Sequence, residues 1–146
     1  MSRRSSREKA FIFLFEMSFG VSTPEEILEN SKYIYSDEAD ENVEVEDFTR
    51  ETFDGVVNNK ESIDKIIADN LNNWSINRIS KVALSILRLA VYEIMFAKEV
   101  PNSVVADEAV KLAKKYSTIK EATYINGVLG SVIDKAQKNF YDNANM

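Results

Sequence analysis

Apolar residues recur every three or four positions along most of this chain, and they predict a protein built from helices. That spacing places them on one face of a helix, where they can pack into a core. The first such stretch contains Ala10, Phe11, Leu14, Phe15 and Met17. Gly20 follows it, and glycine commonly ends a helix because it adopts the left-handed conformation without strain. We therefore expect the first helix to end near Gly20.

Three short motifs predict where helices begin. In each, a hydroxyl can accept a hydrogen bond from a helix amide, while an acid three residues later reaches back. The pairs are Ser5 with Glu8, Thr23 with Glu26, and Thr118 with Glu121. Pro24 strengthens the second start, since proline is favoured at the first helical position.

The middle of the chain predicts one long helix. Residues that can share one face of it are Val45, Phe48, Thr52, Val56, Ile63, Ile66, Ile67 and Leu71. Gly55 and the Asn58–Asn59 pair weaken its centre. We nevertheless expect this helix to continue to near Trp74.

The second half begins with "ISKVALSILRLAVYEIMF", from Ile79 to Phe96, which is apolar on most sides and predicts a central helix enclosed by others. Pro101 then interrupts the pattern. The next amphipathic stripe contains Val104, Val105, Ala109, Leu112 and Ala113.

The last segment contains Asn126 and Gly127, a pair that often forms a hairpin turn. Helical spacing favours a helix instead, because Ala122, Ile125, Leu129, Val132, Ile133 and Ala136 follow a period of three and four. Gly127 and Gly130 would then give that helix a smooth side that another backbone can approach.

Composition limits the chemistry. The chain has 146 residues, 45% of them hydrophobic, which suits one domain over residues 1–146. It contains no Cys, the residue that supplies thiolates, and no His, the commonest general base and metal ligand. We expect no enzyme activity, no metal and no cofactor. No apolar run approaches the roughly 18 residues of a membrane span, so we expect a cytoplasmic protein without a membrane partner.

Charge is unevenly distributed around a net value of -6. The first nine residues hold Arg3, Arg4, Arg7 and Lys9 against one acid, and we expect residues 1–9 to form a basic, flexible arm. Residues 75–146 contain ten Lys or Arg and seven Asp or Glu. Between them, residues 36–51 hold eight acids and one Arg, and we expect an acidic loop at 36–47.

Two basic regions that flank an acidic middle favour a polyanion on one side of the molecule. The alternative is that Lys111, Lys114, Lys115 and Lys120 only solvate helix faces. For the arm this alternative is weaker, because cations at a helix start oppose the helix dipole and do not stabilise it. Cations on an arm that ends on a helix are well suited to contact phosphates.

Four strings occur here in an informative order: "ILRLAVYEI" (86–94), "VP" (100–101), "DEAVKLAKKY" (107–116) and "YINGVLGSV" (124–132). Together they resemble the C-terminal signature of the NusB family of bacterial antitermination factors. The match is close over residues 73–136. The arginine-rich start followed by an aromatic-rich helix is similar too, though more loosely.

This resemblance implies an all-helical fold of about seven helices in two packed, bundle-like halves. It implies binding of single-stranded boxA RNA in ribosomal RNA leader transcripts, together with the small-subunit ribosomal protein that acts as NusE. It also implies entry into the antitermination complex on RNA polymerase. The residues that match the family's RNA-binding positions are Arg3, Arg4, Arg7, Lys120 and Tyr124.

The chain departs from the family pattern at Gly130, where an acid is common, and at Ala83 and Leu84, where charged residues are common. Arg88 and Glu93 fit the signature. For these two we favour structural ion pairing within or between helices over a role in RNA binding.

Two other functions remain to be weighed. Some RNA methyltransferases carry a NusB-like domain, but this chain has no Gly-rich loop after a strand for a nucleotide cofactor. The other alternative is a helical protein-protein interaction module without direct RNA binding. The sequence leaves open the RNA sequence recognised, the residues that face NusE, the order of the arm without RNA, and a weak homodimer of the free protein.

Overall fold

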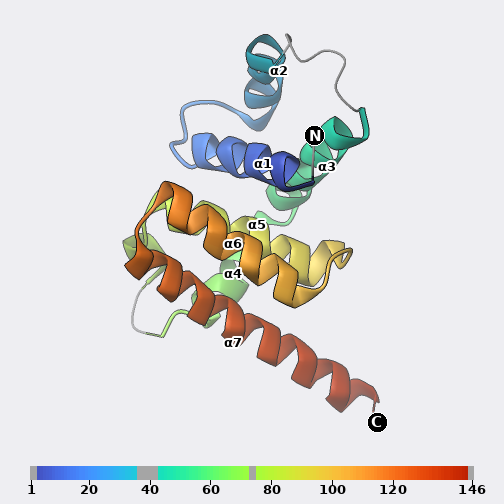
Figure 1. Ribbon diagram of the computed structural model, residues 1–146, viewed down its shortest axis with the longest axis vertical. Coiled ribbons are helices and arrows are strands. Elements are labelled where there is room, and N and C mark those ends of the chain that lie inside the picture. Colours follow the sequence, from blue (N-terminus) through green and yellow to red (C-terminus); the bar gives the residue numbers. More distant parts are fainter. Residues whose placement is uncertain (1–2, 36–42, 73–74, 145–146) are drawn as a thin grey trace. The chain divides into compact units, whose positions relative to one another are not determined.

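The computed structural model describes residues 3–35, 43–72 and 75–144, and their regular elements are all helical (Figure 1). The helices are α1 (Arg3–Met17), α2 (Pro24–Tyr35), α3 (Val43–Asn58), α4 (Lys60–Asp69), α5 (Lys81–Tyr92), α6 (Asn102–Tyr116) and α7 (Ile119–Ala144). A 3₁₀ turn, η2 (Ile76–Arg78), precedes α5, and a π-helical turn, η3 (Glu93–Ala97), follows it. The predicted all-helical fold is confirmed.

Contacts divide the chain into an N-terminal unit, Met1–Asn59, and a C-terminal unit, Lys60–Met146. The expected two halves are therefore present. The expectation of one domain over residues 1–146 stays a prediction. None of the described helices is both long and apolar enough to cross a membrane.

The N-terminal unit is built on the packing of α1 against α3, with α2 in contact with both. Its core includes Phe11 and Leu14 of α1, Ile27 of α2, and Phe53 and Val56 of α3, all almost fully buried. The predicted start of α2 is confirmed. The Thr23 amide donates to Glu26 Oε1 at 3.2 Å, and the Glu26 amide donates to Thr23 Oγ1 at 3.1 Å.

The first helix differs from its prediction at one end. It includes Arg3, so the start predicted at Ser5 is wrong, and the arm expected at residues 1–9 is helical from Arg3 onward. Its other end is as expected. The Gly20 amide donates to the Met17 carbonyl at 3.0 Å, and Gly20 has a φ of 70°, in the left-handed region.

The single helix expected through the middle of the chain is wrong, because α3 ends at Asn58 and α4 begins at Lys60. The Asn59 side chain donates to the Gly55 carbonyl at 2.8 Å, alongside its own amide at 3.1 Å. Such local side-chain bonds compete with helix continuation. Trp74, the expected end, lies outside the described residues. Of the expected acidic loop, residues 43–47 belong to α3 and residues 36–42 lie outside the described part.

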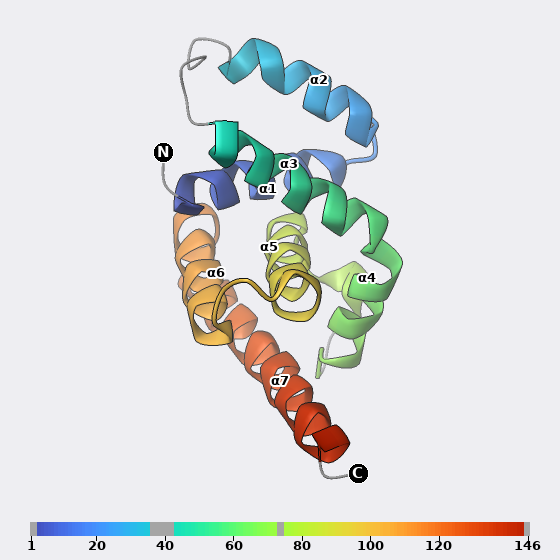
Figure 2. The same cartoon turned by 90° about the vertical axis from the view of Figure 1, so that its right-hand side faces the viewer.

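The C-terminal unit surrounds α5, which contacts α4, α6 and α7 (Figure 2). Ile86, Leu87 and Val91 of α5 are fully buried, which confirms the predicted central helix. Ser80 caps it, since its hydroxyl accepts from the Ala83 amide at 3.0 Å.

The last segment is one continuous helix, so helical spacing gave the correct answer over the hairpin signal of Asn126 and Gly127. Gly127 and Gly130 are exposed within it. Apart from the neighbouring residues and the nearby backbone of α7 itself, a Cβ added at either position would meet no described atom within 4 Å. The close backbone approach expected at these glycines is therefore not made by the described residues.

Candidate nucleic-acid interface

The first turns of α1 present the arginines that the sequence singled out. Arg3 and Arg4 are exposed, whereas Arg7 retains only 5% of its accessible surface. The Arg3 guanidinium carbon lies 4.3 Å from the centroid of the Phe48 ring of α3, a cation–π contact. This end of α1 therefore offers two accessible cations, one of them held over an aromatic ring.

This end of α1 is also fixed through its backbone. Thr49 of α3 is buried and donates from Oγ1 to the carbonyl of fully buried Ser6 at 3.2 Å. A buried hydroxyl loses free energy unless it is paired, so this bond favours one position of α3 along α1. The exposed Arg3 and Arg4 thus belong to a helix end that is packed in place, and Arg7 is buried there.

The second group of candidate residues lies at the start of α7. Lys120 is exposed, and Tyr124, one turn later, is partly exposed. The Tyr124 hydroxyl is buried and has no hydrogen-bond partner in the part of the chain that the structure describes. Burial raises the pKa of Tyr124 above its usual value. The hydroxyl of Tyr124 is therefore withdrawn from water, although the residue as a whole is partly exposed.

The sequence analysis did not single out two exposed side chains that lie shortly before this group in the chain. Tyr116, at the end of α6, is 38% exposed, and Lys115 Nζ lies 5.4 Å from the centroid of its ring. Ile119, which opens α7, is 76% exposed. The sequence did offer a signal for an exposed Tyr116: in the string "KKY" two lysines come directly before it, after the last apolar positions of the stripe.

For one lysine of α6 the structure supports the alternative interpretation, that these lysines only solvate helix faces. Lys111 Nζ lies 3.7 Å from Glu108 Oε1, one turn earlier on the same helix, and its side chain is more than half exposed. Such pairs on helix surfaces contribute only a few tenths of a kcal/mol. Lys111 is therefore accounted for as a surface ion pair.

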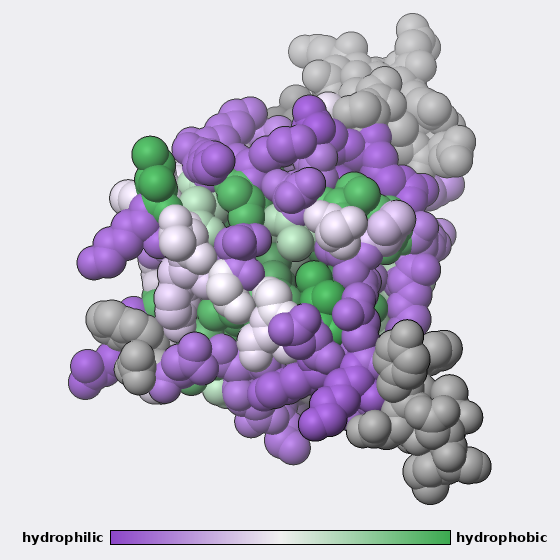
Figure 3. All heavy atoms as spheres, turned by 60° about the horizontal axis from the view of Figure 1, so that its bottom comes forward, coloured by the Kyte–Doolittle hydropathy of each residue, from purple (hydrophilic) through white to green (hydrophobic). Residues whose placement is uncertain are grey.

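Exposed apolar side chains also occur elsewhere. In the N-terminal unit they include Phe19 and Val21, and in the C-terminal unit Phe96 and Val104. On the face drawn in Figure 3, hydrophilic side chains surround a smaller area of hydrophobic ones. No group of three or more acids that could hold a metal occurs within residues 3–35, 43–72 and 75–144.

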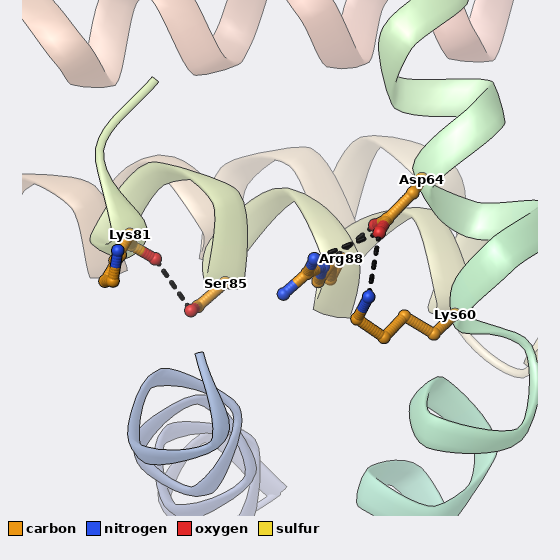
Figure 4. Close-up of polar contacts among 5 residues, drawn as sticks. All are labelled: Lys60, Asp64, Lys81, Ser85 and Arg88. Atoms are coloured by element: carbon orange, nitrogen blue, oxygen red, sulfur yellow. Dashed lines mark hydrogen bonds and ion pairs between the residues drawn. The ribbon is translucent and has the colours of Figure 1, made fainter. Parts of the chain in front are cut away.

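Arg88 is a structural residue, as favoured from the sequence. Its Nε donates to Asp64 Oδ1 at 2.8 Å and its Nη2 donates to Asp64 Oδ2 at 3.0 Å, which joins α5 to α4 (Figure 4). Lys60 Nζ adds a contact to Asp64 Oδ2 at 3.3 Å. Arg88 is 6% exposed, and Glu93 is buried as well. Neither side chain is displayed for an external ligand.

The structure thus brings Arg3, Arg4 and Arg7 together on α1 and places Lys120 and Tyr124 together on α7. The first group belongs to the N-terminal unit and the second to the C-terminal unit. Each group is therefore described as a candidate surface of its own unit. The first is mainly cationic, and the second combines a cation with aromatic side chains, the two features that hold single-stranded nucleic acid.

Comparisons with a family model and with known proteins point to the same family. The family model described as "NusB family" matches residues 4–134. The transcription antitermination protein NusB of Clostridium novyi (strain NT) is 47% identical over 135 residues, covering 91% of this chain and 98% of that protein.

Solved structures agree with the sequence comparisons. The structure of T. maritima NusB matches with a TM-score of 0.80 and 36% identity, covering 92% of each chain. A structure of NusB and NusE in complex with double-stranded RNA matches with a TM-score of 0.80 and 28% identity. That match covers 91% of this chain and 96% of the other.

Proposed function

The chain belongs to the NusB family, and from this premise we propose that it is a non-enzymatic RNA-binding adaptor in transcription antitermination. One observation carries the proposal. A relative named for that function is 47% identical along nearly the whole length of both chains. As an adaptor on nascent transcripts, the protein would act in the cytoplasm, as part of the antitermination complex on RNA polymerase.

We propose that it binds RNA jointly with the ribosomal protein that acts as NusE. The support is the similar solved complex, which contains NusB, NusE and double-stranded RNA. The RNA expected for this chain is the single-stranded boxA segment of ribosomal RNA leaders. Because the solved complex holds a duplex, the two forms of RNA need to be compared directly.

The proposed contacts divide by chemistry. Arg3 and Arg4 are exposed and suit phosphate contacts, as does Lys120 at the start of α7. Arg7 is proposed as a weaker contributor, because its side chain would have to leave a buried position to reach a phosphate. Tyr124 is proposed to support a base with its ring, because the residue is partly exposed.

The test is a titration of fluorescently labelled RNA with the full chain in the presence of saturating NusE protein, over a series of salt concentrations. Single-stranded boxA RNA, its duplex and a scrambled single strand are compared. The proposal expects preferred binding of the boxA strand with a steep loss of affinity as salt rises. Absence of binding to every RNA, with NusE bound to the chain, would instead support the helical protein-interaction module.

A further inference from the structure

The same sequence motif adopts two different geometries in this molecule. Thr23 with Glu26 and Thr118 with Glu121 share the spacing of a capping box. At the start of α2 both reciprocal bonds form. At the start of α7 the Glu121 amide donates to Thr118 Oγ1 at 3.0 Å, but the Glu121 carboxylate turns elsewhere.

Glu121 Oε1 instead accepts two hydrogen bonds from hydroxyls outside α7. Ser80 Oγ donates to it at 2.6 Å, and Ser117 Oγ donates to it at 2.6 Å. Bonds from a hydroxyl to a carboxylate are short and strong compared with neutral ones. One carboxylate oxygen therefore ties the first turn of α7 to residues on two other segments.

Those two residues mark the ends of the neighbouring helices. Ser80 caps the start of α5, and the same hydroxyl oxygen that donates to Glu121 accepts from the Ala83 amide. Ser117 follows the last residue of α6, and its amide donates to the Ala113 carbonyl at 2.7 Å. Glu121 thus fixes where α7 starts relative to both α5 and α6, within the C-terminal unit.

The turn that Glu121 fixes is the one that carries the second candidate surface. Lys120 is its chain neighbour, and Tyr124 lies three residues further on, the spacing at which helical side chains are neighbours on one face. We infer that Glu121 is a positioning residue for RNA binding at the start of α7, acting through Lys120 and Tyr124. This inference rests on the proposed function.

Two substitutions of Glu121 separate the effect of its hydrogen bonds from the effect of its negative charge. A carboxylate beside an RNA site repels phosphates, so loss of its charge alone favours binding. Glu121→Gln removes the charge but keeps an oxygen acceptor for Ser80 and Ser117. Glu121→Ala removes both the charge and the acceptor. The two variants have equal charge, so a difference in RNA affinity between them reports the hydrogen bonds.

The experiment measures boxA RNA affinity of the full chain with NusE for the parent, both Glu121 variants, and Glu26→Ala as the matched capping-box control in the other unit. Glu121→Gln should bind at least as tightly as the parent. Glu121→Ala should bind about fivefold more weakly than Glu121→Gln, the factor that one typical hydrogen bond contributes to an equilibrium. Glu26→Ala should bind as the parent does.

Two further measurements distinguish positioning from a general loss of structure. In a Tyr124→Ala background, the difference between the Glu121 variants should shrink, because residues that act as a unit are not additive. Amide hydrogen exchange of residues 120–124, measured without RNA, should accelerate in Glu121→Ala and stay unchanged in Glu121→Gln.

The outcomes separate this inference from the proposed function. If the parent binds RNA and the Glu121 variants bind equally, the positioning role is wrong while the proposed function stands. Equal amide exchange in the two variants also overturns it. If the parent with NusE binds no RNA at all, both fail together.

Discussion

At the scale of single residues, Tyr124 best separates base stacking from charge. Its buried hydroxyl has no partner among the described residues, and an unsatisfied buried donor costs about 1 to 3 kcal/mol. Tyr124→Phe should therefore leave thermal stability equal or higher and RNA affinity nearly unchanged. Tyr124→Ala should lower RNA binding by about 1 to 3 kcal/mol without changing its salt dependence.

Both Tyr124 variants need a melting temperature and an RNA affinity from the same sample. The competing role is pure packing. A large fall in melting temperature of Tyr124→Ala, with RNA affinity intact where the protein is still folded, would contradict the stacking role.

The raised pKa of Tyr124 predicts a pH effect on stability. A folded-state pKa above the unfolded value means that the folded chain holds its phenolic proton more tightly. That contribution is fully present below the unfolded pKa of about 10 and is lost as pH rises through the folded value. The free energy of unfolding of the parent, relative to Tyr124→Phe, should be constant from pH 7 to about 9 and fall above about 10. A constant difference across this range would contradict burial of the hydroxyl.

The arginines of α1 are expected to behave differently from one another. Arg3→Ala with Arg4→Ala should leave the melting temperature nearly unchanged and reduce RNA affinity. It should also flatten the logarithmic salt slope by about 0.7 for each phosphate that the variant no longer neutralises. Arg7→Ala should instead lower stability, because it empties a buried position. Equal stability loss in the double variant and in Arg7→Ala would show that burial does not separate these residues.

At the scale of elements, the contribution of the Arg88–Asp64 ion pair, which joins α4 to α5, can be compared with that of the exposed Lys60–Asp64 contact. Asp64→Ala should cost about 3 kcal/mol or more, since it leaves the guanidinium of Arg88 buried without its partner. Lys60→Ala is the control, because it removes only the exposed contact to the same carboxylate and should cost less than about 1 kcal/mol. Urea unfolding of both variants checks this, and similar losses would contradict the structural role of Arg88.

Local signals predicted the elements well where one residue type determines the backbone. Gly20 ended α1 through its positive φ, and Thr23 began α2 through a closed capping box. The period of three and four correctly placed Asn126 and Gly127 inside α7. The break at Asn59 was missed, because continuous apolar spacing hid a local side-chain bond to the Gly55 carbonyl.

The candidate site was harder to predict from the sequence than the helices were. Whether a charged side chain is buried depends on residues that lie far away in the chain. Arg3, Arg4 and Arg7 look equivalent in sequence, yet only Arg7 is buried. The acceptor role of Glu121 required Ser80, which lies far away in the chain. Tyr116 and Ile119 are exposed, and the local signal for Tyr116, two lysines directly before it in the string "KKY", was not used.

At the scale of the whole molecule, the charge distribution limits what the chain can do alone. A protein of net charge -6 with two small basic surfaces should hold a short RNA weakly, near the 10⁻⁴ to 10⁻⁶ M that is typical of electrostatic contacts at about physiological salt. A second, basic protein bound beside it would extend the surface for the RNA. We therefore expect tight binding to require the partner.

The central claim is joint recognition of RNA by this chain and NusE, and its most direct test is boxA RNA affinity measured with and without saturating NusE. We expect NusE to tighten RNA binding and, by thermodynamic linkage, RNA to tighten NusE binding by the same factor. An RNA affinity that saturating NusE leaves unchanged would contradict the account.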